Sequence, residues 1–568
     1  MRRRFPAASP RGAGRRPARG GGRRTSGLLL GRPRPALGTR GVKRGELVVL
    51  LHAHLPWVRH PELPFFLEEH WLFEAVFECY LPLVEALRAL ERDGVPVRLT
   101  VDVSPTLAAM LEDPLLRGRT AEFGARLLRL CRQEEERTRG DRAFSDVVAF
   151  YRKRLTRLLD LYERLGRDLN GELARLERAG LLELATCAAT HPILPSLLDR
   201  PELARGQIRT AVREHERIFG RRPRGIWLPE CAYAPPLDRY LAEADLRWFA
   251  VDAHGLLSAS PSPRYGIYAP CWTEHGVAVF ARDVASAREV WSARGGYPGD
   301  PVYREFYRDV GWDLPFEQIA PFIDPSGQRM FTGLKYYRIT GETEAKEPYD
   351  PRAARARALE HGDHFVARRR EQARDQASRM DRPPVLFCPY DAELFGHWWF
   401  EGPWFLERVF RSLAAADDLD PATPGDVLAR AGALQVVDLE PSSWGAGGHL
   451  AVWLDESNEW CLPHLTGIGE RLAARLEERD PGDAAKGRIL RQAVREAMLA
   501  QASDWPFLMS TGTAVEYATR RFTEHVQRFN RLDGMLGRVA LEGDDRRFLE
   551  LCEERDGLFP SLDLADFA

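Results

Sequence analysis

Paired cysteines, lysines and long apolar runs are scarce or missing in this sequence. None of the eight cysteines among the 568 residues forms a CxxC pair, which argues against zinc-ribbon and thioredoxin-like sites. No stretch approaches the ~20 apolar residues that a membrane-spanning helix needs. The net charge of −2 gives no reason to expect a nucleic acid or a membrane as partner. Scattered cysteines in a chain without a secretory segment predict reduced thiols and a cytoplasmic protein.

Although the net charge of the whole chain is near zero, the N-terminal segment is strongly basic. Residues 1–44 hold fourteen arginine or lysine side chains and no acidic one. The segment is rich in Arg, Gly, Pro and Ala, and such a composition cannot bury enough apolar surface to offset the entropy of ordering it. We therefore predict a disordered basic extension over 1–44.

Apolar runs that end in polar residues recur along the rest of the chain. Each run is typical of a buried parallel strand followed by a loop, and helical stretches such as 149–180 separate them. Strands that alternate with helices predict a parallel α/β sheet or barrel, in which the loops after the strands form the active site. The runs are 46–51, 95–105, 181–195, 224–233, 246–255 and 383–399.

The pattern of apolar and polar residues changes after about residue 440. Residues 465–510 and 513–536 have helical periodicity, so we expect a C-terminal helical domain. Residues 256–330 are rich in Gly, Pro and Tyr and show few clear periods. Long loops of this kind in a compact domain are often functional.

Two carboxylates stand at the ends of predicted strands among aromatic residues. Glu230 follows "GIWLP", and Asp391 follows "VLFCPY". A carboxylate in such surroundings is costly unless it is paired or used. Two of them from different strands suggest work on a glycosidic bond, with one ionised group that attacks and one protonated group that releases the leaving oxygen. Trp and Tyr rings fit the flat C–H faces of sugars.

A second hypothesis starts from the histidines. His52 and His54 close the first strand as "HAH", and two histidines on one strand can bind a metal ion together. Asp102 and His191, at later strand ends, would complete such a site. This pattern favours metal-assisted hydrolysis or deacetylation with an activated water, and the residues alone leave it open.

Four longer blocks decide between these readings. They are "HAHLPWVRHPE", "ATHPILP", "GIWLPECAY" and "YDAELFGHWWFEGP", and they resemble the conserved blocks of glycoside hydrolase family 57 from about residue 46 to 540. The resemblance implies a (β/α)7 barrel with an inserted subdomain and a C-terminal helical domain. It also implies retaining chemistry on α-glucans without a metal or other cofactor.

The resemblance implies roles for single residues. Glu230 matches the catalytic nucleophile and Asp391 the general acid/base. His54 and His191, and less clearly His52, match ligands of the sugar beside the nucleophile. Further matches contact or flank the glucan: Arg308, Trp312, Trp444, Trp453 and Asp504.

Within the family, residues 290–313, 442–460 and 501–513 are similar to 1,4-α-glucan branching enzymes, which cleave an α-1,4 bond and form an α-1,6 branch. An α-amylase or 4-α-glucanotransferase of the same family is the alternative, and a non-catalytic glucan-binding protein is a remote one. The branching enzymes also carry a gating tyrosine, which the residues between 256 and 300 do not identify.

We therefore expect a basic extension over 1–44, a catalytic barrel over 45–440 and a helical domain over 441–568 that contributes to the cleft. The inserted subdomain is expected at about 236–285. Nothing in the sequence sets an oligomeric state.

Overall fold

A seven-stranded parallel barrel forms the centre of the protein in a computed structural model that describes residues 45–325, 327–538 and 542–567. The basic extension predicted over 1–44 lies outside these residues. The hydrogen-bonded order of the parallel strands is β7-β5-β4-β3-β2-β1-β8. The strands are β1 (Gly45–Ala53), β2 (Leu99–Val103), β3 (Leu182–Cys187), β4 (Gly225–Trp227), β5 (Trp248–Val251), β7 (Ala278–Ala281) and β8 (Val385–Asp391).

The first and last strands of this order meet and close the barrel. Asp283, just after β7, donates its backbone N–H to the carbonyl of Phe387 in β8 at 2.7 Å. The rings of Phe280 and Phe387 pack beside this bond, with centroids 5.4 Å apart. Two short strands extend the sheet: β6 (Cys271–Trp272) pairs antiparallel with β7, and β9 (Leu419–Pro421) pairs with the start of β1. The predicted (β/α)7 barrel is confirmed.

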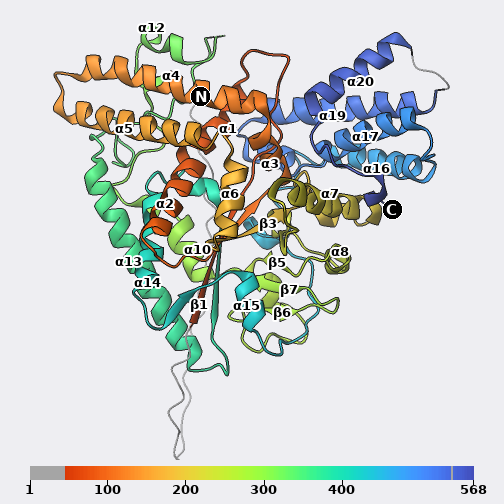
Figure 1. Ribbon diagram of the computed structural model, residues 1–568, viewed down its shortest axis with the longest axis horizontal. Helices are drawn as coiled ribbons and strands as arrows, with labels where there is room; N and C mark the ends of the chain where they lie inside the picture. The colour runs from red at the N-terminus through yellow and green to blue at the C-terminus, as the bar shows by residue number, and fades with distance from the viewer. Residues whose placement is uncertain (1–44, 326, 539–541, 568) are drawn as a thin grey trace, which may run out of the picture. The chain divides into compact units, whose positions relative to one another are not determined.

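Helices cover the outside of the barrel (Figure 1). The helices bury their apolar faces against the strands or against neighbouring helices. In α5, which packs mainly on α4, Val147, Tyr151, Leu155 and Leu158 are buried. The helices up to β8 are α1 (His70–Ala75), α2 (Leu81–Arg92), α3 (Pro105–Glu112), α4 (Pro114–Thr138), α5 (Arg142–Arg164), α6 (Leu169–Arg178), α7 (Pro201–Phe219), α8 (Leu237–Glu243), α9 (Ala253–Leu257), α10 (Val284–Trp291), α11 (Val310–Asp313), α12 (Phe316–Ile319) and α13 (Pro351–Ala377).

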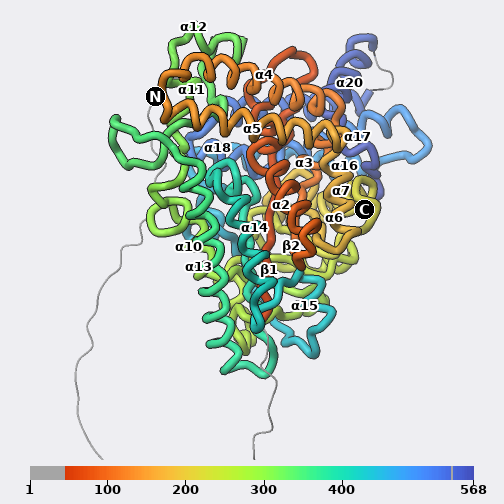
Figure 2. Tube along the Cα trace, turned by 60° about the vertical axis from the view of Figure 1, so that its left-hand side comes forward, coloured from red at the N-terminus to blue at the C-terminus, as the bar shows by residue number. Residues whose placement is uncertain are grey.

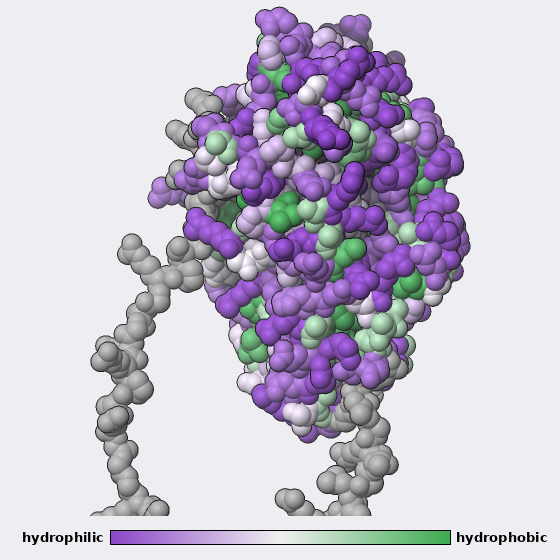
Figure 3. Space-filling model, turned by 90° about the vertical axis from the view of Figure 1, so that its left-hand side faces the viewer, coloured by the Kyte–Doolittle hydropathy of each residue, from purple (hydrophilic) through white to green (hydrophobic). Residues whose placement is uncertain are grey.

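The chain after β8 is mainly helical, as predicted. In Figures 1 and 2 its last helices, coloured blue, lie together near α3 and α7. No helix among the described residues is long and apolar enough to span a membrane. On the face that Figure 3 shows, hydrophobic side chains form small separate areas. These helices are α14 (Gly402–Ala414), α15 (Pro424–Arg430), α16 (Cys461–Glu477), α17 (Ala484–Ala500), α18 (Asp504–Thr511), α19 (Val515–Leu536) and α20 (Gly543–Asp556).

All six runs predicted as strands contain one. The seventh barrel strand, β7, lies in the region predicted as long loops, which also holds β6 and α10. Residues 236–285, where we expected an inserted subdomain, include the barrel strands β5 and β7, and the longest connection between barrel strands follows at 282–384. The domain limits stay predictions. All eight cysteines are buried and free of disulfides.

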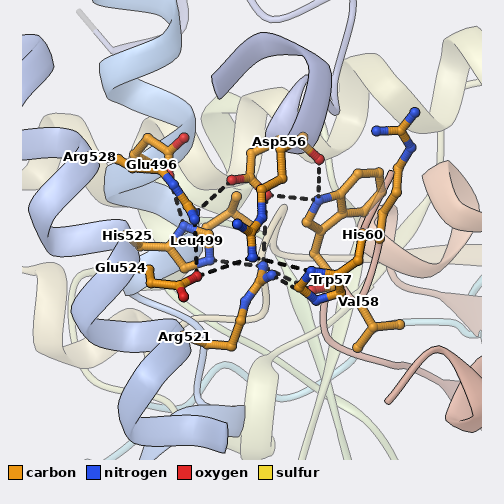
Figure 4. Close-up of polar contacts among 12 residues, drawn as sticks. Trp57, Val58, His60, Glu496, Leu499, Arg521, Glu524, His525, Arg528 and Asp556 are labelled. Carbon is orange, nitrogen blue, oxygen red and sulfur yellow. Dashed lines mark hydrogen bonds and ion pairs between the residues drawn. The ribbon is translucent and has the colours of Figure 1, made fainter. Parts of the chain in front are cut away.

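A buried polar network joins the C-terminal helices to the loop after β1 (Figure 4). We call it the docking network, and its members are Trp57, His60, Glu496, Arg521, His525, Arg528 and Asp556. Asp556, at the end of α20, accepts from the Trp57 indole at 3.1 Å and from Arg528 at 2.9 Å. Arg521 on α19 donates to the backbone carbonyl of Trp57 at 3.2 Å. The network therefore fixes the C-terminal helices to the segment that carries His52 and His54.

Candidate active site

Glu230 sits in a tight turn directly after β4. Its φ is 60°, the φ of Cys231 is 49°, and that of His191, after β3, is 59°. Residues with a side chain rarely adopt this left-handed backbone, which costs of order 1–3 kcal/mol for each. The strained residues gather where two neighbouring strands end. The surrounding contacts stabilise this strained backbone and fix the direction in which the Glu230 and His191 side chains point.

Both carboxyl oxygens of Glu230 accept a hydrogen bond from the C-terminal half of the chain. The Trp444 indole N–H donates to Oε2 at 2.8 Å, and the Ser503 hydroxyl donates to Oε1 at 2.9 Å. The Trp444 backbone N–H also donates to the Glu230 carbonyl at 2.9 Å. The Glu230 side chain keeps 13% exposure. The Glu230 side chain is therefore held in one orientation, and a small part of its surface stays accessible.

Three histidine rings line the site beside Glu230. The rings of His54 and His191 stack with centroids 3.8 Å apart, and the ring of His52 stacks on Trp227 at 4.9 Å. His54 Nε2 lies 3.1 and 3.2 Å from the carboxylate oxygens of Asp504, the first residue of α18. The C-terminal helices thus bring Asp504 as well as Ser503 to the end of the barrel.

Asp391 is the last residue of β8, and the sheet register places it beside His52, which is itself beside Asp102 of β2. Burial raises the pKa of Asp391 well above its usual range, and the negative charges of Glu393 and Glu230 raise it further. The Arg282 guanidinium opposes this rise. His52, the register partner of Asp391, lies 3.1 Å from the His191 ring, and His191 Nδ1 lies 3.8 Å from Glu230 Oε1, so both carboxyl groups stand at the same end of the barrel.

The environments of the two carboxyl groups differ in a chemically useful way. Burial also raises the pKa of Glu230, to about 7, but the hydrogen bonds from Trp444 and Ser503 favour its ionised form. Asp391 has no such donors among its main influences, and the negative charges of Glu393 and Glu230 further disfavour its ionised form. One group is thus suited to attack as a carboxylate and the other to give a proton, the division of labour that a retaining glycosidase needs.

Other predicted residues lie farther from this pair. Trp453 is buried, and its ring lies 6.2 Å from that of Phe507. It packs in the same small apolar cluster as Trp444. Arg308 forms an ion pair with Asp313 at 2.8 Å, and Trp312 is 54% exposed. The structure therefore brings together Glu230, Asp391, the three histidines, Trp444 and Asp504. Contacts of a glucan with Arg308, Trp312 and Trp453 stay predictions.

Two contributors were missed from the sequence. Ser503 directly precedes the predicted Asp504, so its position was a usable signal. Arg282, just after the unrecognised strand β7, pairs with Asp252 at 2.5 Å, and its guanidinium lies 5.6 Å from the Trp444 ring centre. Arg282 therefore links the side of the site that holds Trp444 to Asp391.

Metal-ligating side chains also meet here. The ligand atoms of His54, His191 and Asp504 lie within 4.8 Å of one another. These atoms already bond to one another or to neighbours, as His54 does to Asp504, and His52 contacts Asp102 directly. In the docking network, Glu496, His525 and Asp556 form a similar group. There, Arg528 and the Trp57 indole already bond to Asp556.

Replacing Trp444 by phenylalanine should move the acid limb of the pH–activity profile upward. The change keeps an aromatic ring but removes the N–H that stabilises the Glu230 carboxylate. The pKa of Glu230 then rises from about 7, and catalysis by the carboxylate begins at higher pH. A shift of roughly one pH unit follows from the usual strength of a hydrogen bond to a charged group. The check is kcat/KM against pH, with Trp460→Phe as control. An unmoved acid limb would contradict the assignment.

The site agrees with comparisons against known proteins. Residues 48–347 match the model of glycosyl hydrolase family 57, and residues 464–567 match the model described as 1,4-alpha-glucan branching enzyme, C-terminal. A curated 1,4-alpha-glucan branching enzyme of Thermococcus kodakarensis is 34% identical over 548 residues, which cover 91% of this chain and 77% of that protein.

Solved structures with the same fold include two close relatives. The alpha-amylase AmyC from Thermotoga maritima has a TM-score of 0.86 and 38% identity and covers 92% of this chain and 99% of its own. A branching enzyme of the same family from Pyrococcus horikoshii has a TM-score of 0.83 and 32% identity, with 92% and 96% covered. The family model spans more than half of the chain, and the resemblance read from the four blocks is confirmed: the chain belongs to glycosyl hydrolase family 57.

Proposed function

We propose that the protein is a 1,4-alpha-glucan branching enzyme, a retaining transferase that cleaves an α-1,4 bond and forms an α-1,6 branch in a glycogen-like glucan. The main observation in support of this proposal is that Ser503 and Asp504 contact residues at the end of the barrel. Both residues belong to the segment that matches the C-terminal model of branching enzymes. Ser503 bonds to Glu230, and Asp504 bonds to His54. The C-terminal region thus supplies part of the active site.

The proposed first half-reaction uses the two carboxyl groups together. Glu230 attacks the anomeric carbon of a glucosyl unit and forms a covalent ester. Asp391 gives its proton to the O4 atom of the leaving chain, so that this chain departs as a neutral alcohol. The hydrogen bonds to Glu230 fix its position for attack. The separation of charge states described above supports this assignment.

In the second half-reaction the ester is transferred to another glucan chain. Asp391, now ionised, takes the proton of an acceptor 6-hydroxyl while that oxygen attacks the anomeric carbon and Glu230 leaves as a carboxylate. Two inversions give overall retention. Transfer succeeds only if the acceptor reaches the ester before water does, so rings that shield the site from water favour branching.

An exposed tryptophan stands at this site. Trp291 ends α10, is 38% exposed, and its ring lies 6.3 Å from that of Trp444 at an angle of 89°. The gating tyrosine expected between 256 and 300 has three candidates in the sequence. Tyr297 is buried, and its hydroxyl bonds to His364. Tyr265 packs beside Arg264 and Tyr268 beside Gln372. The exposed ring that packs against Trp444 is that of Trp291.

The activity assay separates the proposal from its alternatives. With amylose, the protein should lower iodine staining with few new reducing ends, and the product should yield short linear chains after enzymatic debranching. The 38% identity to an alpha-amylase keeps hydrolysis as the second candidate. Many new reducing ends and no chains released by debranching would favour it. Complete loss of activity upon chelation would point to the metal-assisted hydrolase instead.

The substrate and setting follow from the same proposal. We infer that the partner is an α-glucan such as amylose or glycogen and that the protein works in the cytoplasm, where reduced cysteines persist. All eight thiols are buried, so they take no evident part in the reaction.

A further inference from the structure

A continuous chain of hydrogen bonds leads from the barrel interior to Glu230. His52 Nδ1 contacts Asp102 Oδ2, and His52 Nε2 lies 3.1 Å from His191 Nε2. His191 Nδ1 lies 2.7 Å from the Ser503 oxygen, which lies 2.9 Å from Glu230 Oε1. Four contacts thus connect two carboxyl groups, that of Asp102 in β2 and that of Glu230 in the turn after β4. The reaction proposed above gives Asp102 no role.

The chemistry of the groups fixes the direction of every bond in this chain. An ionised Glu230 can only accept, so the single hydroxyl proton of Ser503 points to Glu230. Ser503 must then accept from His191, which places the His191 proton on Nδ1 and leaves Nε2 as an acceptor. Two facing acceptors would repel, so His52 carries its proton on Nε2. Its Nδ1 then accepts, and Asp102 must be the donor.

The burial of these groups agrees with that direction. Asp102 is fully buried, and its second oxygen, Oδ1, has no hydrogen-bond partner, which suits a neutral carboxylic acid far better than a carboxylate. Burial raises the pKa of Asp102 well above its usual range, and the nearby charge of Glu393 adds to the rise. Burial also lowers the pKa values of His52 and His191, so both rings are neutral and each holds one proton.

We propose that Asp102, His52, His191 and Ser503 form a proton relay to Glu230, through which the two carboxyl groups share one proton. In one state Asp102 holds the proton and Glu230 is the carboxylate. In the other, each member passes one proton onward: Asp102 to His52, His52 to His191, His191 to Ser503, and Ser503 to Glu230. No proton is gained or lost. The proposal rests on the nucleophilic role of Glu230, and it makes the four others positioning residues.

The charged groups around the two ends bias this equilibrium. Glu230 faces the charges of Asp504 on α18 and of His54 just after β1, and Asp391 of β8 responds to Glu230 in turn. The Trp444 indole adds a second donor to Glu230. Asp102 faces His52 and the charge of Glu393. The two donors at Glu230, against one histidine contact at Asp102, favour the state in which Glu230 is ionised and ready to attack.

The relay is tested with the full-length enzyme by replacing Ser503. Ser503→Ala removes the hydroxyl that joins the relay to Glu230, so the acid limb of kcat/KM against pH should move upward by about one pH unit, with a lower kcat. Ser503→Thr keeps the hydroxyl and should return the limb toward its original position. Ser510→Ala, in the helix α18 that begins directly after Ser503, should leave the profile unchanged. An unmoved limb in Ser503→Ala would overturn the proposal.

A second measurement uses the wild-type protein, so it does not depend on whether a variant folds. Nitrogen NMR of the wild-type protein with labelled histidine, at a pH about one unit above the pKa of Glu230, reports which ring nitrogen carries the proton. The relay expects Nε2–H for His52 and Nδ1–H for His191, and a proton on Nδ1 of His52 would overturn it. If the relay fails while Glu230→Gln is inactive, the proposed function stands. If Glu230→Gln is active, both fail.

Discussion

Replacing Glu230 by glutamine is expected to lower kcat by roughly 10⁴-fold or more, the range found when a catalytic nucleophile is removed. Glutamine keeps the size of the side chain, and its single amide oxygen can accept from one of the two donors, Trp444 or Ser503, so the fold should survive. It cannot form a stable glucosyl ester. The measurements are kcat on amylose and thermal unfolding, and a variant that folds normally and keeps turning over would remove Glu230 from the mechanism.

The role of Asp391 is separated from that of Glu230 by the stereochemistry of rescue. A small anion such as azide can replace the missing group in an alanine variant. In Asp391→Ala, azide attacks the ester on Glu230, and two inversions give the α-glucosyl azide. In Glu230→Ala, azide attacks the substrate directly, and one inversion gives the β product. An activated aryl α-glucoside oligomer serves as substrate, because it needs no acid to release its leaving group.

Glu393→Gln is the matched control for these variants. Glu393 lies two residues from Asp391 and accepts from the Tyr80 hydroxyl. Its charge raises the pKa of Asp391, so its loss should shift the basic limb of the pH profile downward and cost less activity than either catalytic variant. The same azide product from both alanine variants would refute the division of roles between Glu230 and Asp391.

The fold was predictable where local sequence and tertiary contacts agree. Six strands can be recognised in the sequence as apolar runs that end in polar residues. The strand β7 cannot be recognised in this way, because only four apolar residues, Ala278–Ala281, form it within a region rich in Gly and Pro. Its pairing with β5 and β6 supplies the order that its own sequence does not signal.

The site was predictable where it follows the rule that polar side chains gather at strand ends. That rule places Glu230, Asp391 and the histidines on one rim. It does not identify Ser503, which directly precedes α18 and lies 273 positions later in the sequence than Glu230. Nor does it give the left-handed turn at Glu230 or the position of Arg282, because both arise from long-range packing. For Arg308 and Trp312 the sequence predicts contacts with a glucan, and those contacts can be seen only when a glucan is bound.

Loss of the docking network is expected to have the second largest effect, this time on stability. Arg521 and Asp556 are both fully buried. Arg521→Ala would leave Asp556 with fewer compensating charges and would remove the bonds to Trp57 and His525. Breaking a buried ion pair by removing one partner costs about 3–5 kcal/mol. The midpoint of chemical unfolding should fall accordingly, and Arg520→Ala, an exposed neighbour on α19, should leave it nearly unchanged.

The same variant should lose activity before the barrel unfolds. α18 carries Ser503 and Asp504 to the site and lies in the chain between α17 and α19, both of which the docking network holds. When the network loosens, the donor to Glu230 and the partner of His54 move away while the strands stay paired. Activity should therefore disappear at a lower denaturant concentration than the far-ultraviolet signal of the folded chain, by a wider margin in Arg521→Ala than in the wild type. Coincident losses in both proteins would show that the network contributes to global stability alone and does not position the active site.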